Sequence, residues 1–351
     1  MVRKSDKRVR VAVIGASGYT GADFIRLALR HPGIEIVSLI AKSHAGKAMD
    51  DVFPHLAGLG LPALVSEEDA DWAGVDTVVC GLPHGTAHQI IARLPQRVKV
   101  VDMSADFRLR DTRTYAEWYG LEHGAPELLA EAVYGLTEHY AEAIARTRLV
   151  ACPGCYPTAT LLALLPLVAN RLVDAEDLVI DAKSGVSGAG RALKQNTLFS
   201  EAGEGMSPYS VAKHRHAPEI EQEIGRAWGA PVTVNFTPHL VPMSRGELCT
   251  CYVRLVGKAG ADDLRAALVA AYRDKPFIRV LAAGKMPATQ NVRGSNYVEI
   301  AVFADRIKGR AIVISALDNL VKGSAGQAMQ NFNLMHGWPE ATAVEQLPLF
   351  P

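Results

Sequence analysis

The sequence predicts an α/β protein with two domains. At 351 residues the chain exceeds the usual size of a single domain. Its first half alternates short strands rich in β-branched residues with helical segments, which is typical of a parallel sheet. Its second half contains longer strands in which apolar and polar residues alternate, and this indicates an α+β domain with a mixed, largely antiparallel sheet. Because the strand pattern changes after Cys155, we place the domain boundary there.

The strands of the first half are continuous apolar runs, and the segments between them are amphipathic. Such runs indicate strands that are covered on both faces, as in a parallel sheet flanked by helices. We expect strands at residues 8–15, 34–41, 75–82 and 98–104, with helices at 21–32 and 85–95.

The second half predicts a sheet with one packed face and one face that is solvated or in an interface. Within 247–257, Cys249, Cys251 and Val253 share one face, while Thr250 and Tyr252 share the other. The expected strands are 177–184, 232–242, 247–257, 296–305 and 310–317, and the final helix is expected at 319–335.

Charge and hydropathy exclude several classes of partner. Lys+Arg and Asp+Glu both number 37, so there is no net charge to attract nucleic acid or an anionic membrane. The longest apolar run, 161–169, is too short to span a bilayer and contains Pro166. The basic N-terminus runs directly into a strand without an apolar h-region, so we expect no secretory signal.

The cysteine content favours a reducing compartment. Five cysteines, odd in number and unevenly spread, do not resemble a disulfide framework. We therefore expect a cytoplasmic protein.

A glycine-rich loop joins the first strand to the first helix. In "GASGYTG", Gly15 permits a tight turn, Gly18 lets the backbone approach a ligand, and Gly21 allows close packing of helix on strand. This predicts a Rossmann-type dinucleotide-binding domain, although the spacing is GxxGxxG rather than GxGxxG, and an ordinary strand-to-helix turn is the alternative. The predicted cofactor-binding residues of the loop are Gly15, Ser17, Gly18, Tyr19, Thr20 and Gly21.

The end of the second strand favours NADP over NAD. A site selective for NAD usually places an acidic residue here to bind the ribose hydroxyls. This chain has Lys42, Ser43 and Lys47 instead, and cations with a hydroxyl suit a 2′-phosphate. The alternative is that both lysines are simply solvated surface residues.

The stretch "VACPGCYPTATLLALLPL" (150–167) admits three interpretations of Cys152 and Cys155. A redox CxxC pair is expected early in a small thioredoxin-like domain, not between two domains. A zinc site would need about two more ligands, for which His214 and His216 are available, but the spacing matches no standard zinc motif. Under the third interpretation Cys155 is a nucleophile and Cys152 is buried packing.

The third interpretation fits the local sequence best. A strand ends at Cys152, Pro153-Gly154 turns the chain, and a helix begins at Cys155. In the first turn of a helix, unsatisfied N–H groups and the helix dipole stabilise a thiolate, which is a nucleophile for acyl transfer. His214 and His216, between Lys213 and Arg215, are the candidate proton carriers, and this basic group would suit an anionic substrate. A solvated basic turn is the alternative.

Several blocks of the sequence, in the same order, resemble the N-acetyl-γ-glutamyl-phosphate reductase family. The cysteine block is the most specific, and the resemblance covers essentially the whole chain. The blocks are "GASGYTG" (15–21), "MSADFRL" (103–109), "VACPGCYPTATLLALLP" (150–166), "SGVSGAGR" (184–191), "KHRHAPEI" (213–220) and "NLVKGSAGQAMQNFN" (319–333).

The resemblance implies an NADP-dependent oxidoreductase of arginine biosynthesis with an acyl phosphate substrate. It implies that Cys155 is the nucleophile and that His214, with His216 second, is the acid/base. It further implies Arg108 and Arg191 as anchors for substrate carboxylate or phosphate, Asn319 near the nicotinamide, and no metal. The cofactor-binding domain would comprise 1–154 and 320–351, and the catalytic and oligomerisation domain 155–319, forming a homodimer or homotetramer.

Two rival functions are compatible with these motifs. The nearer one is a lysine-pathway paralogue that reduces a carrier-linked aminoadipyl phosphate, which would share every block. The other is a non-catalytic, NADP-sensing protein that kept the fold, against which the intact Cys155 and paired histidines argue.

Overall fold

The computed structural model describes residues 8–351 and divides into two compact units. The first unit comprises the residues up to Pro153 together with Ser324–Glu345, and the second comprises Gly154–Gly323 with Gln346–Pro351. The sequence expectation placed all of 320–351 with the first domain. The structure instead groups Gly154, residues 320–323 and the last six residues with the second unit. There the Leu349 N–H donates to the Arg293 carbonyl at 2.8 Å.

The first unit is a parallel sheet with helices. Over the described residues its seven strands have the order β3-β2-β1-β4-β5-β7-β6, and every neighbouring pair is parallel. The strands are β1 (Val9–Ile14), β2 (Ile34–Ile40), β3 (Leu64–Val65), β4 (Thr77–Cys80), β5 (Lys99–Asp102), β6 (Val133–Tyr134) and β7 (Leu149–Ala151). The helices are α1 (Tyr19–Ala28), α2 (Met49–Val52), α3 (Ala87–Arg93), α4 (Thr112–Tyr119), α5 (Thr137–Arg146) and α10 (Gly326–Met335).

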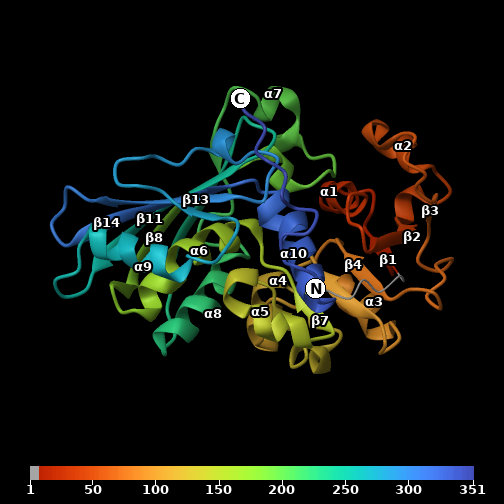
Figure 1. Cartoon of the computed structure of the whole chain (residues 1–351), viewed down its shortest axis with the longest axis horizontal. Helices are drawn as coiled ribbons and strands as arrows, with labels where there is room; N and C mark the ends of the chain where they lie inside the picture. The colour runs from red at the N-terminus through yellow and green to blue at the C-terminus, as the bar shows by residue number, and fades with distance from the viewer. Residues whose placement is uncertain (1–7) are drawn as a thin grey trace. The chain divides into compact units, whose positions relative to one another are not determined.

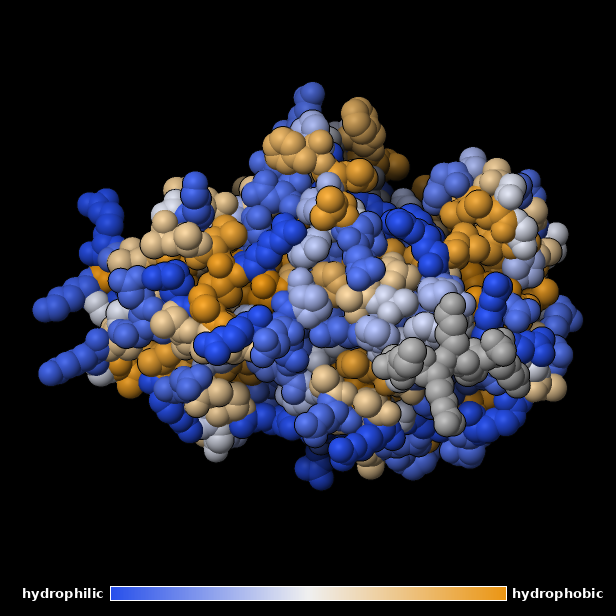
Figure 2. All heavy atoms as spheres, in the orientation of Figure 1, coloured by the Kyte–Doolittle hydropathy of each residue, from blue (hydrophilic) through white to orange (hydrophobic). Residues whose placement is uncertain are grey.

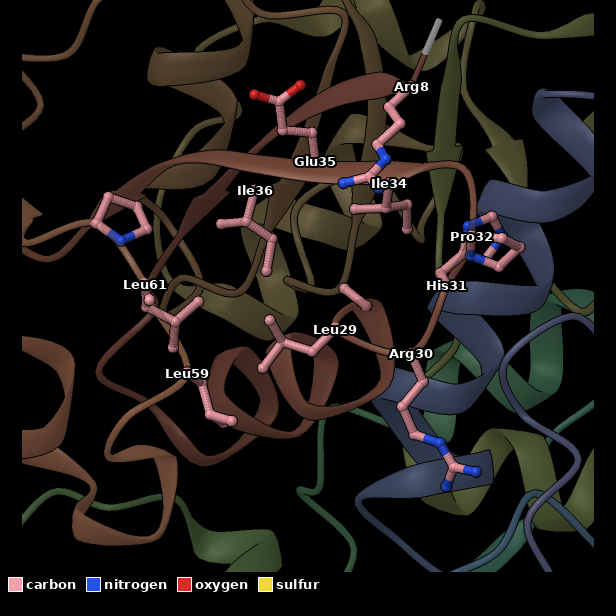
Figure 3. Close-up of a pocket in the computed structure, with 13 residues that line it drawn as sticks. Arg8, Leu29, Arg30, His31, Pro32, Ile34, Glu35, Ile36, Leu59 and Leu61 are labelled. Atoms are coloured by element: carbon pink, nitrogen blue, oxygen red, sulfur yellow. The ribbon is translucent and has the colours of Figure 1, made fainter. Parts of the chain in front are cut away.

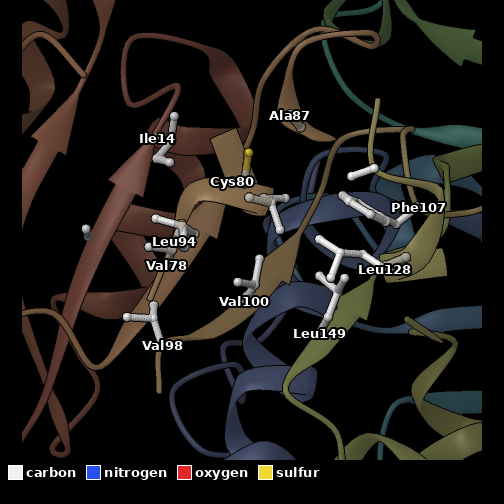
Figure 4. Packing of buried hydrophobic residues seen from close by; sticks show 14 of the residues in the cluster. Ile14, Val78, Cys80, Ala87, Leu94, Val98, Val100, Phe107, Leu128 and Leu149 are labelled. Atoms are coloured by element: carbon white, nitrogen blue, oxygen red, sulfur yellow. The ribbon is translucent and has the colours of Figure 1, made fainter. Parts of the chain in front are cut away.

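Continuous apolar strands build the core of the first unit. Val78, Val100 and Leu149 come from three neighbouring strands and pack with Phe107 and Leu128 into one buried cluster (Figure 4). On another part of the sheet, α10 packs against α1 and α5. The chain thus returns to the first unit after completing the second.

The second unit is a mixed sheet covered by helices. Its described strands have the order β12-β13-β14-β11-β8-β10-β9, in which β12/β13 and β8/β10 are parallel and the other pairs antiparallel. The strands are β8 (Val173–Gly185), β9 (Ser207–Pro208), β10 (Asn235–Val241), β11 (Glu247–Leu255), β12 (Ile278–Val280), β13 (Val298–Ala304) and β14 (Arg310–Leu317). The helices are α6 (Cys155–Ala169), α7 (Phe199–Ala202), α8 (Ala217–Trp228) and α9 (Ala261–Ala271).

Helix α6 is the centre of the second unit. It packs on β8, β11 and β14 and on the helices α8 and α9 (Figure 1). Because its residues are apolar all round, every side chain from Tyr156 to Val168 is buried. Only its first residue, Cys155, remains partly exposed among Cys155–Val168. The fold therefore presents one thiol at the end of a buried helix.

The predicted fold class is confirmed, with differences in detail. The first helix begins at Tyr19 rather than 21, because Gly18 adopts the extended backbone of an N-cap (φ −87°, ψ 164°), and it ends at Ala28, before Pro32. The alternation in β11 is as expected, with Cys249, Cys251 and Val253 buried. The sequence predicted neither the short strands β3, β6 and β12 nor the helices α4, α5 and α9.

Candidate active site

Cys155 opens α6 and differs from the other four cysteines in its exposure. It is partly exposed, whereas Cys80, Cys152, Cys249 and Cys251 are buried. The preceding Gly154 is the N-cap, with extended backbone at φ −65° and ψ 161°. The positive end of a 15-residue helix therefore lies at this sulfur and favours its thiolate form.

Cys152 has the opposite environment. Its side chain is fully buried in the first unit, and the amide of Asn331 donates to its sulfur at 3.5 Å. Burial raises the pKa of the Cys152 thiol to about 12. Cys152 therefore remains a thiol at neutral pH and acts as packing.

The two histidines adopt different roles in the loop that leads into α8. The backbone N–H of His216 donates to Nδ1 of His214 at 3.1 Å, which places the proton of neutral His214 on Nε2. Burial, followed by the charge of Arg215, lowers the pKa of His214 to about 4. His214 is therefore neutral at physiological pH, with Tyr156, Tyr209 and Phe236 around its ring.

His216 lies directly against Gly154, the residue that precedes Cys155. A β-carbon added to Gly154 would lie 2.3 Å from Nε2 of His216, so only glycine leaves room for the imidazole. The rings of His214 and His216 are 4.6 Å apart. Of the two predicted histidines, His216 is thus the one in contact with the backbone at the start of α6.

Two further residues fix the position of Cys155. The Gly154 N–H donates to the Glu219 carboxylate at 2.9 Å, and Glu219 is 1% exposed. Such a hydrogen bond to a charged, buried acceptor is strong and directional. On the other side, a β-carbon on Gly323 would lie 2.8 Å from Cβ of Cys155, so the backbone there packs closely on the nucleophile.

Glu247, the first residue of β11, is buried beside Cys155. Burial raises the pKa of the Glu247 carboxyl to about 8, opposed by hydrogen bonding with the Cys155 thiol and reinforced by the charge of Asp318. A carboxylic acid that is protonated near pH 7 thus faces the sulfur.

The buried carboxyl predicts a pH-dependent stability. The pKa of Glu247 is near its ordinary value of 4.5 in the unfolded chain but about 8 in the folded chain, so between these values the folded state binds more protons. Stability should therefore fall as pH rises through this window, by up to about 1.4 kcal/mol per pH unit. Glu247→Gln removes this loss, so urea denaturation should show the variant gaining on the wild type between pH 5 and 8. Glu299→Gln, a buried glutamate of β13, is the control and should show no such trend.

Asn319, Arg191 and Arg108 differ in their burial and in their hydrogen bonds. In the second unit, the Asn319 amide accepts from the Gly246 N–H at 2.8 Å and donates to Ser187 Oγ at 3.0 Å, joining the loop 184–191 to the turn before β11. Arg191, at the end of that loop, is exposed. Arg108 lies in the first unit and is 8% exposed, and its guanidinium donates to the carbonyls of Cys152 (2.8 Å) and Met103 (3.1 Å).

The glycine loop of the first unit has the geometry of a phosphate-binding turn. Gly15 has φ +78°, and a β-carbon there would lie 2.4 Å from the Gly81 carbonyl oxygen. A β-carbon on Gly21 would lie 2.5 Å from the Gly15 oxygen. At Gly18 the sole neighbour within 4 Å would be the Gly15 oxygen at 3.3 Å, which leaves space for a ligand at the start of α1.

The remaining predicted cofactor residues surround this edge of the sheet. Ser17 and Thr20 are partly exposed and Tyr19 is 36% exposed. Ser43 follows β2 in a short 3₁₀ turn (Lys42–His44) and its hydroxyl contacts His44 Nδ1 at 2.9 Å. Both β1 and β2 end here, so the loop and the turn share the carboxyl edge of the parallel sheet.

A cavity of about 380 Å³ lies at the opposite edge of the same sheet. It is lined by residues from the start of β2, including Ile34 and Glu35, and by Arg8, Leu59 and Leu61 (Figure 3). This is the amino end of the strands, away from the glycine loop. We assign it no part in the site.

The described part of the chain gives two further findings. Within residues 8–351, no group of three or more His, Cys, Asp or Glu side chains is arranged to hold a metal ion. In the same range no helix is long and apolar enough to cross a membrane.

Sequence reasoning missed Glu219, Glu247 and Gly323. Glu247 carried a readable signal, because it has the same strand parity as the buried Cys249 and Cys251, where a charged residue is out of place. Glu219 stands one helical turn after His216, which placed it near that histidine. Gly323 gave no local signal.

Two family models match the chain. One, described as the NAD binding domain of semialdehyde dehydrogenase, matches residues 10–147, and the other, the dimerisation domain of semialdehyde dehydrogenase, matches 155–319. The first match ends at residue 147 and the second begins at Cys155.

Relatives and solved structures agree with these models. A protein from Rhodospirillum rubrum named N-acetyl-gamma-glutamyl-phosphate reductase is 53% identical over 350 residues, covering 98% of this chain and 99% of that one. A protein from Arabidopsis thaliana named probable N-acetyl-gamma-glutamyl-phosphate reductase, chloroplastic, is 53% identical over 348 residues, covering 99% and 87%.

Likeness in fold extends to more distant proteins. The structure of aspartate semialdehyde dehydrogenase II from Vibrio cholerae matches with a TM-score of 0.71 at 18% identity, covering 95% of this chain and 99% of that chain. The family resemblance seen in the sequence is confirmed by the close relatives, together with the prediction of an oxidoreductase enzyme. The chain belongs to the N-acetyl-γ-glutamyl-phosphate reductase family, within the semialdehyde dehydrogenases.

Proposed function

We propose that this protein reduces N-acetyl-γ-glutamyl phosphate to N-acetyl-glutamate 5-semialdehyde and phosphate, using NADPH, in arginine biosynthesis. The observation that carries the proposal is the partly exposed Cys155 at the start of a buried helix, with His216 against the preceding residue, in a chain 53% identical to relatives of that name. We further propose a cytoplasmic location, as predicted from the sequence.

The first step would be acyl transfer to Cys155. The thiolate attacks the γ-acyl carbon, the carbon–oxygen bond to the phosphate breaks, and a thioester remains on the sulfur. The backbone N–H groups at the start of α6 stabilise the negative charge that develops on the acyl oxygen. Glu219 supports this geometry because it holds the Gly154 N–H at 2.9 Å.

The second step would be reduction of the thioester. The nicotinamide dinucleotide supplies the hydride when bound, and Gly15, Gly18 and Gly21 with Ser17, Tyr19 and Thr20 are the residues that would hold it. The resulting oxyanion needs a proton, which must leave again as the aldehyde departs. We propose His216 as this proton carrier, supported by its contact with Gly154, and His214 as the residue that orients it through the 3.1 Å bond.

Anion binding is proposed for two arginines. Arg191 is exposed at the end of the loop held by Asn319, and a guanidinium there suits the substrate carboxylate or phosphate. Arg108 is proposed for the same role; its guanidinium is buried and donates to the Cys152 carbonyl. Asn319, proposed to lie near the nicotinamide, would act through the loops that its amide joins.

We propose that Lys42, Ser43 and Lys47 select NADPH over NADH. All three are exposed after β2, where no acidic residue stands. Replacing Lys42 by Ala and Ser43 by Asp together should raise the KM for NADPH at least about 10- to 100-fold, since even one lost charge-assisted hydrogen bond contributes about 1.5–3 kcal/mol. The KM for NADH should fall or stay constant. Steady-state kinetics with both cofactors would check this, with exposed Lys308→Ala as control; unchanged NADPH preference would contradict it.

We propose a homo-oligomer, dimer or tetramer, assembled through the second unit. Two observations support this: the match of 155–319 to a dimerisation domain, and exposed apolar side chains such as Phe199 (91%) and Phe350 (71%). Figure 2 shows apolar residues at the surface where α7 and the C-terminal segment lie. Light scattering on the purified protein would give the number of subunits.

The proposed function is tested by running the reaction in reverse. N-acetyl-glutamate 5-semialdehyde with NADP⁺ and phosphate should give NADPH, and omission of phosphate should stop steady turnover. A carrier-linked aminoadipate semialdehyde is the matched alternative substrate. Turnover of the carrier-linked aminoadipate semialdehyde but not of N-acetyl-glutamate 5-semialdehyde would overturn the proposed substrate. Turnover of neither compound would contradict the proposed class of reaction.

A further inference from the structure

Glu247 carries a buried carboxyl group that makes no well-formed hydrogen bond within the described residues. Its side chain is 0% exposed, and within residues 8–351 neither carboxyl oxygen has a hydrogen bond of ordinary geometry. Buried carboxyl groups in folded proteins are normally paired, because an unpaired polar atom loses its hydration without compensation. The burial of the Glu247 carboxyl without a well-formed hydrogen bond therefore needs a chemical explanation.

The register of the second unit places this carboxyl under the start of α6. Glu247, Cys249 and Cys251 point to the face of β11 that packs on the helix. Cys249 and Thr160 of α6 interact through their side chains, in a contact looser than a well-formed hydrogen bond. Glu247 lies two residues before Cys249 on the strand, a distance of about 7 Å. Cys155 lies five residues before Thr160 on the helix, a distance of about 7.5 Å. The carboxyl and the thiol accordingly interact directly, in a contact looser than a well-formed hydrogen bond.

Within residues 8–351, no cation is among the groups whose charge acts on Glu247. The titratable groups that act on Glu247, or on which it acts, are the Cys155 and Cys249 thiols, the Tyr156 and Tyr209 phenols, and the Asp318 carboxyl. Asp318 is itself occupied by the Gly294 N–H at 2.7 Å and by Arg245 at 3.5 Å. Burial and the charge of Asp318 raise the pKa of Glu247 to about 8, close to the range in which a thiol titrates.

We propose that Glu247 is a catalytic partner of Cys155 that shares one proton with its sulfur, accepting the proton as the thiolate forms and holding it while the sulfur is acylated. The inference rests on the proposed function for the identity of the acylated intermediate. The pairing of the two groups is independent of the substrate.

The proton balance closes over the cycle. In the reactive state the pair holds one proton, carried by Glu247 when the sulfur is a thiolate. The sulfur forms its bond to the acyl carbon as the bond to phosphate breaks, and Glu247 remains neutral beside the thioester. When the carbon–sulfur bond breaks after reduction, the neutral carboxyl donates a hydrogen bond to the departing thiolate, and the one-proton state returns.

A purely structural role predicts different behaviour. A stabilising carboxyl would bind backbone N–H groups or a cation, as Glu219 does with Gly154 and Asp318 with Gly294. Glu247 does neither. If it were only a buried acid, its replacement would change stability but leave the titration of Cys155 unaltered.

The deciding experiment measures how fast iodoacetamide alkylates Cys155 as a function of pH, with the modified peptide quantified by mass spectrometry. In the wild type the pair loses two protons in two coupled steps, so alkylation should reach its plateau only after the upper step. In Glu247→Gln no negative charge opposes the thiolate, so a single step should appear with its midpoint at least about one pH unit below the upper wild-type step. The acid limb of kcat/KM in Glu247→Gln should move to higher pH. In the wild type this limb follows the lower of the two coupled steps, and the single step of the variant lies above it.

Two variants control for folding and location. Glu247→Leu places an apolar side chain of similar size in the buried site and should give the same alkylation profile as the Gln variant. Glu299→Gln, the buried glutamate of β13, should retain the wild-type profile. Superimposable profiles for wild type and both Glu247 variants would overturn the inference. If the alkylation profile shifts in the Glu247 variants but the wild type does not turn over the acyl phosphate, the pairing of Glu247 with Cys155 is supported. The proposed function is then contradicted.

Discussion

Cys155→Ser should lose nearly all reductase activity, by at least about 10³-fold in kcat. A serine hydroxyl at the start of α6 gains little from the helix dipole, because its pKa lies far above that of a thiol, and the alkoxide needed for attack is not populated. Binding of NADP⁺, measured by calorimetry, should be unchanged within about twofold, since the glycine loop belongs to the first unit. The loss would then be one of chemistry and not of folding.

Cys152→Ser is the matched control for this substitution. Cys152 is fully buried, and its sulfur accepts from Asn331 at 3.5 Å, a contact that a serine oxygen partly retains. The expected cost is one of packing, a lowered melting temperature with kcat within a few fold of the wild type. If Cys155→Ser kept a tenth of the activity, or if Cys152→Ser proved the more damaging change, the covalent route through Cys155 would be wrong.

His216→Asn should lower kcat by about 10²- to 10⁴-fold, the usual contribution of a positioned general acid or base. His214→Asn should be much milder, because the asparagine oxygen lies close to the position of Nδ1 and can still accept from the His216 N–H. Burial keeps His214 neutral down to about pH 4, so an acid limb of the rate profile near pH 6 should not depend on it.

Steady-state kinetics on both histidine variants, as a function of pH, would make this distinction. The proposal requires the larger loss of kcat in His216→Asn. The reverse order of effects would assign the proton transfer to His214, the residue that sequence comparison alone favoured.

Patterns repeated over several residues made most of the fold readable. The run Val9–Ile14 and the glycines at 15, 18 and 21 predicted the first strand and the loop, because each property needed there is local. Strands of two or three residues, such as β3 and β6, contain too few positions to show a period. The parallel pairing of β10 with β8 was not readable either, since alternation identifies the faces of a strand and not its neighbour.

The site was readable where backbone geometry dictates chemistry. Cys155 stood out because Pro153-Gly154 turns the chain into an apolar helix, so its position at the helix start followed from sequence neighbours. The choice between His214 and His216 could not be made, because it depends on which ring meets Gly154, a contact of 62 residues' separation in the chain. Glu247 lies nearly a hundred residues from Cys155 and reaches it only through the packing of β11 on α6.

The central claim is that the reaction passes through an acyl group bound to Cys155. The most direct measurement incubates the protein with N-acetyl-glutamate 5-semialdehyde and NADP⁺ in the absence of phosphate, quenches it in acid, and maps the acyl group by mass spectrometry. The account predicts one equivalent of NADPH formed per active site, with the N-acetyl-glutamyl group on the peptide that contains Cys155 and released when phosphate is added before the quench. NADPH formation without an acyl group on Cys155, or an acyl group on another residue, would contradict it.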